Sequence, residues 1–462
     1  MQRQTDQLCR IVSGVRFEAL DETTVAKVKQ AIIDGIAVAI AGSTQKPIVL
    51  LAQYAHGLGC APAATVWGHG FRSSAAAAAG VNAAAAHVLD YEPMSSPSTH
   101  AVSPVVPVAF ALAETERLPG RELIAACAKG IEVQHRILFS ASQQARAERR
   151  FHPPGVVGVI GAAVAAAHMI GLDALQLRNA LGIAASRAGA LRANAGTMTK
   201  CTHAGNAASA GLEAAILAKR GFTASAEVLE AADGFVAAFF SGGTFDYTRL
   251  LQFGKPYRIV EPGMAYKFFP SKYPTQFAVS AALDLRKAIA DPKRIARVRL
   301  TTPAMRDVDR PQPVSGLDGK FSFQYTTAVA LLDGVVRIDS FTDARRFRAD
   351  VAEFLPKIHL TQSQSIPTDF RRMHVEMEVE TSDGARHATV CSTPKGFWGA
   401  EIRAEDHAAK LYDCLGQVFA AGQIERIIAL VARLEQLEAG DTAELIGLLG
   451  NKPVVTALRA GT

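Results

Sequence analysis

Consecutive helical runs fill the first 265 residues of this chain, and they constrain its fold more than any other feature. Asp21 can cap the first clear run, in which branched apolar residues recur every three or four positions until Gly42. Similar runs cover residues 73–90, 103–116, 121–141, 155–170, 174–185 and 204–219. Alanine is abundant in them, and because it is the best helix former and its side chain is small, helices can approach closely. This part of the chain therefore predicts a large, tightly packed helical domain.

The pattern changes near residue 267. Residues 297–301 and 374–380 alternate between apolar and polar side chains, as a strand with one buried face does. An Asp-Gly pair at 383–384 then marks a tight turn, and 387–391 returns with the same alternation, which predicts a hairpin. Helical runs accompany these strands at 274–289 and 322–332. The segment is expected to form a smaller α+β domain.

Helical spacing returns at about residue 404, so the α+β segment is predicted to be an insertion in the helical domain. The fold class expected is mainly α, with an all-helical domain and a smaller inserted α+β domain. The predicted bounds are 1–266 for the first part of the helical domain, 267–398 for the insertion and 399–462 for the helical return. A chain of 462 residues is long enough for two domains.

Composition and charge argue against several classes of function. The net charge is +6, but the basic residues are dispersed and no aromatic-basic pattern accompanies them, so nucleic-acid binding is not expected. The six cysteines are scattered, which argues against a disulfide framework and a zinc site. Residues 155–172 are apolar apart from His168, but their Gly/Ala content favours a buried core helix over a membrane span. The N-terminus lacks an apolar signal region, so a cytoplasmic location is expected.

The first candidate site residues are Asp90 and His100, which lie on the connection between two apolar helical runs. A carboxylate and an imidazole held there by rigid elements are suited to proton transfer. The alternative is that Asp90 caps a helix end and His100 is a polar loop residue. Other segments must decide between these interpretations.

Three further segments carry residues typical of active sites. His152 precedes Pro153-Pro154 at the start of a Gly/Ala helix, whose free N–H groups suit a carboxylate ligand. Lys200 and His203 follow Gly196 in a polar loop that leads into a helix; Lys200 can pair with a carboxylate or, if desolvated, act as a base. In each case an ordinary loop or surface residue is the alternative.

Lys267 and Lys272 stand among four aromatic residues and two prolines at the expected domain junction, where clefts form. A packed linker with solvated lysines is the other interpretation. The turn Gly316 to Gly319, followed by Lys320, is able to bind an anion, although an ordinary helix entry explains it equally well.

Together the short motifs resemble the MmgE/PrpD family, which includes 2-methylcitrate dehydratases, cis-aconitate decarboxylases and iminodisuccinate epimerases. The motifs are His87-x-Leu89-Asp90, Thr99-His100, Phe151-His152-Pro153, Gly196-Thr197-Met198-Thr199-Lys200, His203-Ala204-Gly205, Lys267-x-x-Pro270, Lys320-Phe321-Ser322 and Pro394-Lys395-Gly396. The resemblance runs over nearly the whole chain. It implies that the inserted α+β domain is a lid and that the protein is a homodimer without a metal or organic cofactor. It also implies a small polycarboxylate substrate, with no nucleic-acid or membrane partner expected.

The resemblance extends to single residues. Asp90, His100, His152, Lys200 and Lys267 fall where the decarboxylase branch has its active-site Asp, His, His, Lys and Lys, and Lys272, His203 and Thr199 are expected to bind substrate. The chain departs from that branch at three positions, with Met94 in place of a Thr, Lys272 of a His and Asp307 of a Tyr. Residues 316–322 look closer to the epimerase branch.

All reactions of this family form or discharge a carbanion or enolate beside a carboxylate. Lys200, Lys267 and Lys272 are expected to hold carboxylates, while His100 and His152 titrate near neutral pH and are the candidate proton carriers. Asp90 is expected to orient His100 or to raise its basicity. Three hypotheses follow: a lyase that eliminates water or carbon dioxide, an epimerase that returns the proton from the opposite face, and a non-catalytic member that only binds anions.

Overall fold

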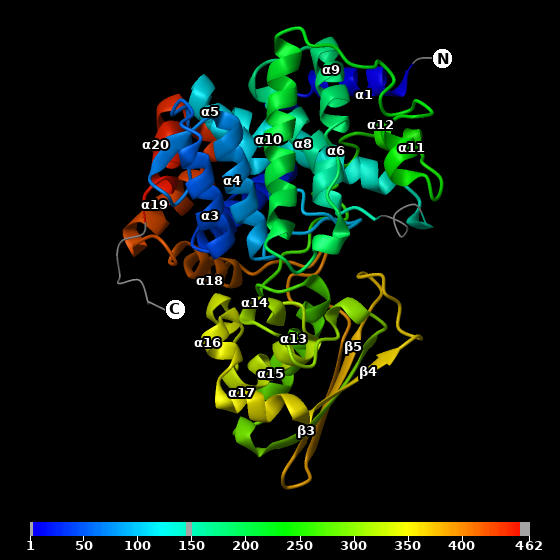
Figure 1. Ribbon diagram of the computed structural model, residues 1–462, viewed down its shortest axis with the longest axis vertical. Coiled ribbons are helices and arrows are strands. Elements are labelled where there is room, and N and C mark those ends of the chain that lie inside the picture. Colours follow the sequence, from blue (N-terminus) through cyan, green and yellow to red (C-terminus); the bar gives the residue numbers. More distant parts are fainter. Residues whose placement is uncertain (1–2, 145–149, 453–462) are drawn as a thin grey trace. The chain divides into compact units, whose positions relative to one another are not determined.

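The computed structural model describes residues 3–144 and 150–452, and its chain forms two compact units (Figure 1). The first unit runs to Met264 and resumes at Arg403, and the second consists of Ala265–Ile402. The sequence placed the corresponding boundaries at 266/267 and 398/399. A lid function of the second unit stays a prediction.

Helices make up most of the first unit, as the apolar spacing predicts. Those before the second unit are α1 (Gln4–Gly14), α2 (Glu22–Ser43), α3 (Lys46–Gly57), α4 (Ala75–Val88), α5 (Val106–Glu116), α6 (Gly120–Ser140), α8 (Pro153–Met169), α9 (Ala174–Ala185), α10 (Thr199–Lys219), α11 (Phe235–Phe240) and α12 (Tyr247–Leu251). Those after it are α18 (Ala404–Leu415), α19 (Ala421–Ala432) and α20 (Ala439–Leu449). The predicted cap is confirmed, because the Asp21 carboxylate accepts a hydrogen bond from the Thr24 N–H at the start of α2. The mainly α class is confirmed.

Small residues let helix α10 pack closely against α4 and α8. A Cβ on Gly205 would stand 2.7 Å from the Gly80 carbonyl oxygen of α4, and one on Gly211 would stand 2.5 Å from the Ala162 Cβ of α8. Larger side chains at these two positions would push the helices apart. The close packing fixes α10, whose first turn carries Lys200.

Two details of the first unit differ from the predictions. Helix α10 begins at Thr199 rather than Ala204, so Lys200 and His203 lie on its first turns instead of in a loop. No sequence signal marks this start, because the N-cap residue Met198 makes no side-chain capping bond. The domain is also not wholly helical: strands β1 (Ala64–Val66) and β2 (Phe71–Ser73) pair as an antiparallel hairpin. Strands of three residues are too short to show alternation.

The second unit is an α+β structure. Its helices are α13 (Tyr273–Arg286), α14 (Gly316–Gly319), α15 (Phe323–Asp333), α16 (Asp343–Arg346) and α17 (Ala349–Phe354), and its strands are β3 (Ile295–Pro303), β4 (Ile358–Ser363), β5 (Val375–Thr381) and β6 (Arg386–Cys391). The predicted hairpin is confirmed, since β5 and β6 pair antiparallel with Val375 opposite Cys391.

One four-stranded sheet, in the order β4-β3-β5-β6, joins these strands. Strand β3 is antiparallel to β5 and parallel to β4, which the sequence did not predict as a strand. Along β5, Val375, Met377 and Val379 are buried and alternate with more exposed glutamates, so one face of the sheet is covered. Helix α13 packs against β5 and β6.

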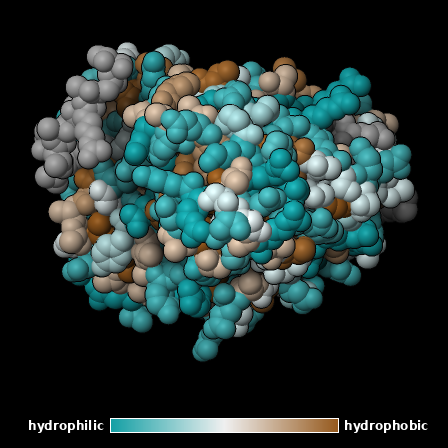
Figure 2. All heavy atoms as spheres, turned by 90° about the horizontal axis from the view of Figure 1, so that it is seen from below, coloured by the Kyte–Doolittle hydropathy of each residue, from teal (hydrophilic) through white to brown (hydrophobic). Residues whose placement is uncertain are grey.

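In the described part of the chain, neither the drawn face nor the single helices are dominated by apolar residues of membrane-spanning length. On the face drawn in Figure 2, hydrophobic residues are scattered among hydrophilic ones, as is normal for a protein surface. Among residues 3–144 and 150–452 no single helix is long and apolar enough to cross a membrane, and only the pair α2 and α3, bent by 86°, reaches that length together.

Candidate active site

The C-terminal end of α4 delivers the first two polar groups of the site. The helix is built from buried alanines, and its last turn carries His87, which is 1% exposed. After the cap residue Leu89, Asp90 adopts a left-handed conformation with φ of 53°. Asp tolerates this conformation better than most residues, and the turn sends the chain away from the helix axis. His87 and Asp90 therefore lie on either side of a sharp change in direction.

The connection from α4 to α5 is buried, although loops usually run over the surface. Its Glu92 has a completely buried side chain. The loop closes where the N–H of Ser95 donates to the Thr99 carbonyl oxygen at 3.0 Å, which brings the chain back so that His100 follows at once. A carboxylate and an imidazole thus enter the interior from one loop.

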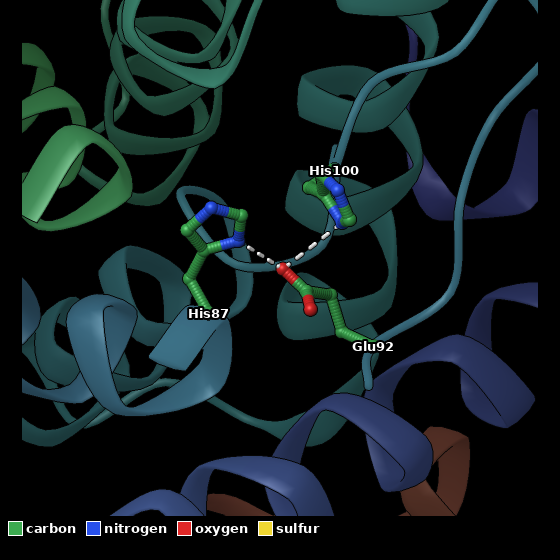
Figure 3. Close-up of side chains that lie close together, drawn as sticks. All are labelled: His87, Glu92 and His100. Atoms are coloured by element: carbon green, nitrogen blue, oxygen red, sulfur yellow. Dashed lines mark hydrogen bonds and ion pairs between the residues drawn. The ribbon is translucent and has the colours of Figure 1, made fainter. Parts of the chain in front are cut away.

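Glu92 is shared between two imidazoles, and Figure 3 shows both rings directed at the same carboxylate oxygen. Glu92 Oε1 lies 2.5 Å from Nδ1 of His87 and 3.2 Å from Nδ1 of His100. A carboxylate at these distances selects the ring form that carries a proton on Nδ1. In each histidine the other nitrogen, Nε2, is then left as the proton acceptor. We call these three residues the His87–Glu92–His100 cluster.

Burial and charge set the protonation of this cluster. Burial alone would raise the pKa of Glu92, but His100 and His87 together outweigh it and hold that pKa well below its usual range. Burial lowers the pKa of His87 to about 4, against the opposing effect of Glu92. At neutral pH the cluster therefore contains a carboxylate and a neutral His87.

An ion pair lies beside the cluster. Lys200 Nζ donates to Asp90 Oδ2 at 2.6 Å, and the other oxygen of Asp90 lies 3.6 Å from His100 Nε2. The side chains of Lys200 and His100 are 14% and 10% exposed, whereas those of His87 and Glu92 are fully buried. The site is thus reached by solvent at Lys200 and at His100.

Two more histidines complete the group. His152, which precedes α8, and His203 of α10 lie with their Nδ1 atoms 3.1 Å apart. Burial, together with His87 and Lys200, holds the pKa of His152 well below its usual range and lowers that of His203 to about 4. Two neutral imidazoles can share this contact only if one carries its proton on Nδ1 and the other on Nε2. The ring centres of His87 and His152 are 5.3 Å apart, so the four imidazoles form one group.

Three of these side chains have the chemistry to hold a metal ion. One ligand atom each from His87, Glu92 and His100 lies within 4.8 Å of the others, all buried. In a tetrahedral zinc site with bonds of about 2.0–2.1 Å, neighbouring ligand atoms stand roughly 3.3 Å apart. The 2.5 Å contact of His87 with Glu92 is shorter than that, and these two atoms form a hydrogen bond.

The structure brings together five of the eight predicted site residues: Asp90, His100, His152, Lys200 and His203. Thr199 is an exposed residue at the start of α10, and its carbonyl accepts a hydrogen bond from the Thr202 hydroxyl.

The other two predicted residues lie in the second unit. Lys267 is 1% exposed, and Lys272 forms an ion pair with Asp307. Lys272 and Asp307, two of the departures from the decarboxylase branch, thus contact each other. The convergence of Lys267 and Lys272 with the histidines stays a prediction.

Sequence reasoning did not assign a role to His87 or Glu92. His87 stands in the motif that ends at Asp90, and Glu92 follows two residues later, but the pattern does not indicate that their side chains are buried. One signal was present: a histidine on the inner face of an alanine helix needs a buried hydrogen-bond partner, and Glu92 is the nearest acid after Asp90.

Comparisons with known proteins cover nearly the whole chain. The MmgE/PrpD N-terminal domain matches residues 6–248, and the MmgE/PrpD C-terminal domain matches residues 269–436. Cis-aconitate decarboxylase of Mus musculus is 32% identical over 94% of this chain and 91% of its own, and that of Homo sapiens is 32% identical over 94% and 92%. Cis-aconitate decarboxylase of Aspergillus terreus is 26% identical over 98% of this chain and 97% of its own.

Proposed function

We propose, from the premise that this chain belongs to the MmgE/PrpD family, that it is a lyase that removes carbon dioxide from a small unsaturated tricarboxylate. Cis-aconitate is the first substrate to test, because relatives that match nearly the whole chain are named for its decarboxylation. The observation that carries the proposal is the buried Glu92 between two imidazoles, beside the Lys200–Asp90 ion pair.

The chemistry of such a substrate defines what the site must supply. When carbon dioxide leaves, the C–C bond breaks and its electron pair stays on the adjacent carbon. A neighbouring double bond spreads this pair over an allylic system and onto a remaining carboxylate, and a proton added at the far end of that system completes the product. The substrate supplies its own electron-withdrawing groups, so we propose a reaction without a cofactor. The protein must hold the carboxylates and deliver one proton.

Lys200 is suited to hold a carboxylate. Its ammonium group is partly exposed and already binds one carboxylate oxygen, that of Asp90. A substrate carboxylate can join the same cation by a charge-assisted hydrogen bond, which is stronger in a desolvated site than in water. Asp90 holds the ammonium group of Lys200 beside the group of histidines.

His100 is suited to carry the proton. Glu92 Oε1 lies 3.2 Å from its Nδ1, and Nε2 exchanges the proton on the side of the ring where Asp90 and Lys200 lie. Glu92 stays anionic and stabilises the imidazolium that forms when Nε2 takes up a proton. His87 fixes the other side of the same carboxylate oxygen. In this scheme His100 and Lys200 act on the substrate, and Glu92 and His87 position His100.

The test is to incubate the purified protein in heavy water with cis-aconitate and with saturated and hydroxylated tricarboxylates. The product and its deuterium are followed by NMR, and released carbon dioxide is measured. The proposal predicts a five-carbon unsaturated dicarboxylate with one deuterium from solvent and an equal amount of carbon dioxide. Deuterium uptake without loss of carbon dioxide would assign the protein to the epimerases instead. Binding without either reaction would support a non-catalytic anion-binding protein.

A further inference from the structure

A second buried charge group lies in the first unit, outside the site described above. Asp34 of α2 is fully buried, and Lys410 of α18 is 3% exposed. Lys410 Nζ lies 2.8 Å from one oxygen of Asp34 and donates to the other at 2.9 Å. His407, one turn earlier in α18, lies with Nε2 3.1 Å from the same carboxylate. Helices far apart in sequence thus meet at one buried ion pair.

The ammonium group of Lys410 has another contact that links it to the site. It donates to the carbonyl oxygen of Tyr91 at 3.0 Å and lies 4.3 Å from the centre of the Tyr91 ring. Tyr91 stands between Asp90 and Glu92 in the chain. One buried cation therefore holds the backbone that joins the two acids of the candidate active site.

Stability alone does not account for this ion pair. Removing two charges from water costs several kcal/mol each, and apolar residues of the same volume often stabilise a fold as well or better. The ion pair instead restrains the backbone, because an ammonium group held by Asp34 donates to the Tyr91 carbonyl oxygen only when that carbonyl points toward it. Such a restraint suits the backbone there, since Asp90 has a φ of 53°, a conformation that Asp tolerates better than most residues but that still costs more than a right-handed one.

We propose that Lys410 and Asp34 are positioning residues for the candidate active site. Lys410 fixes the peptide at Tyr91, so that Glu92 faces the two imidazoles and Asp90 faces Lys200. Asp34 holds the ammonium group of Lys410 in place. This inference rests on the proposed function only in using its activity as one of two readouts.

The experiment compares three variants with the wild-type protein. Lys410→Met removes the cation and keeps its length. Asp34→Asn with Lys410→Met also removes the buried anion, so that the fold does not carry an unpaired charge. Lys29→Met is the matched control: Lys29 also joins a carboxylate, that of Glu435, to a backbone carbonyl, that of Ala432, but touches no residue of the site. Thermal unfolding, kcat and KM are measured for each.

The second readout is the protonation pattern of the histidine rings, observed by ¹⁵N NMR on histidine-labelled protein and assigned by replacing His87 and His100 singly. It needs no substrate, so it remains informative even if the proposed activity is absent. In the wild type both rings are expected to carry a proton on Nδ1. Loss of the Tyr91 restraint should move them toward the Nε2–H form that imidazole prefers in water.

The proposal predicts that the double variant unfolds at a temperature close to that of the wild type. Its kcat should nevertheless fall by about 10- to 100-fold with little change in KM, as expected for a misplacement of about 1 Å. The ring nitrogens of His87 and His100 should shift, and Lys29→Met should change neither readout. Wild-type kcat and unchanged ring signals in a folded double variant would overturn the proposal. So would a lower kcat with unchanged ring signals.

Discussion

Among the described residues of the first unit, two clusters combine a histidine, a glutamate and a nearby lysine. One of them has the features of an active site. In the His87–Glu92–His100 cluster one buried carboxylate oxygen serves two rings, with Lys200 nearby. In the other, Lys129, His168 and Glu122 form a chain. Lys129 Nζ lies 3.0 Å from His168 Nδ1, and His168 Nε2 lies 3.0 Å from Glu122 Oε2.

The difference lies in how completely the polar atoms are satisfied. Both ring nitrogens of His168 have partners, Lys129 also donates to the Val15 carbonyl, and the Glu122 side chain is 32% exposed. In the first cluster, by contrast, His87 Nε2 and Glu92 Oε2 are buried with no hydrogen-bond partner among the described residues. A buried polar atom without a partner is costly and calls for an explanation, of which a catalytic role is one. The comparison predicts that mutations in the first cluster affect activity, and those in the second affect stability.

The largest expected effect is on the two histidines. His100→Gln removes the proton carrier and should lower kcat by about a hundredfold or more. His168→Gln, in the second cluster, should leave kcat of the folded protein unchanged. Steady-state kinetics and thermal unfolding of both variants test this, and equal losses of kcat would remove the distinction between the clusters.

The lysines give the next largest effect. Lys200→Met removes a charge-assisted contact from a desolvated site and should lower kcat/KM by about 30- to 1000-fold, which corresponds to about 2–4 kcal/mol. Lys129→Met should not alter kcat/KM, although burial lowers the pKa of Lys129 to about 7 and makes it a possible base in isolation. Measurement of kcat/KM for both variants tests this prediction. An active Lys200→Met enzyme would exclude this lysine from the reaction.

Acid should destabilise the first cluster. Burial lowers the pKa of His87 to about 4 in the folded protein. Below about pH 6.5 the unfolded chain therefore binds a proton at His87 that the folded protein does not bind. This difference lowers the free energy of unfolding by roughly 3 kcal/mol by pH 4. The lowered pKa of Glu92 adds to this, since the stability it contributes is present above about pH 4.5 and is lost as the pH falls further, through the folded-state value. The urea midpoint of the wild-type protein should fall between pH 7.5 and pH 5. The midpoint of the His87→Gln variant should fall less steeply over the same range. Parallel curves for the two proteins would contradict this assignment.

The smallest expected effect is that of a chelator. If His87, Glu92 and His100 act through hydrogen bonds, prolonged treatment with EDTA should leave kcat unchanged. Loss of activity that a divalent ion restores would make these residues metal ligands. Metal analysis of the active protein by mass spectrometry serves as the independent check.

Sequence patterns predicted the long elements because each carries its own signal. Apolar spacing and the Asp21 cap gave α2, and strict alternation around an Asp-Gly turn gave the β5–β6 hairpin. Strands β1 and β4 were missed for different reasons: β1 has only three residues, and β4 has half-exposed polar side chains next to its apolar ones. The start of α10 was missed because its first turn lacks a side-chain cap.

The site was predictable in part for a similar reason. Asp90 and Lys200 stand near helix ends, His152 stands next to Pro153, and His100 lies on the connection between two apolar helices, so each position suggests a site. The partnership of Glu92 with His87 depends on the fold of a buried loop, and that of Lys410 with Tyr91 joins residues 319 apart in sequence. Contacts of this kind arise from tertiary packing, which no local pattern encodes.

The central claim is that the group of histidines around Glu92, with Lys200, binds a polycarboxylate. A crystal structure with propane-1,2,3-tricarboxylate, a saturated acid that has no double bond to take up the electron pair, tests it most directly. The account predicts one carboxylate on Lys200 Nζ and another part of the ligand within about 3 Å of His100 Nε2. The same structure would show whether Lys267 and Lys272 reach the ligand. A tricarboxylate bound elsewhere, with Lys200 and His100 untouched, would contradict the account.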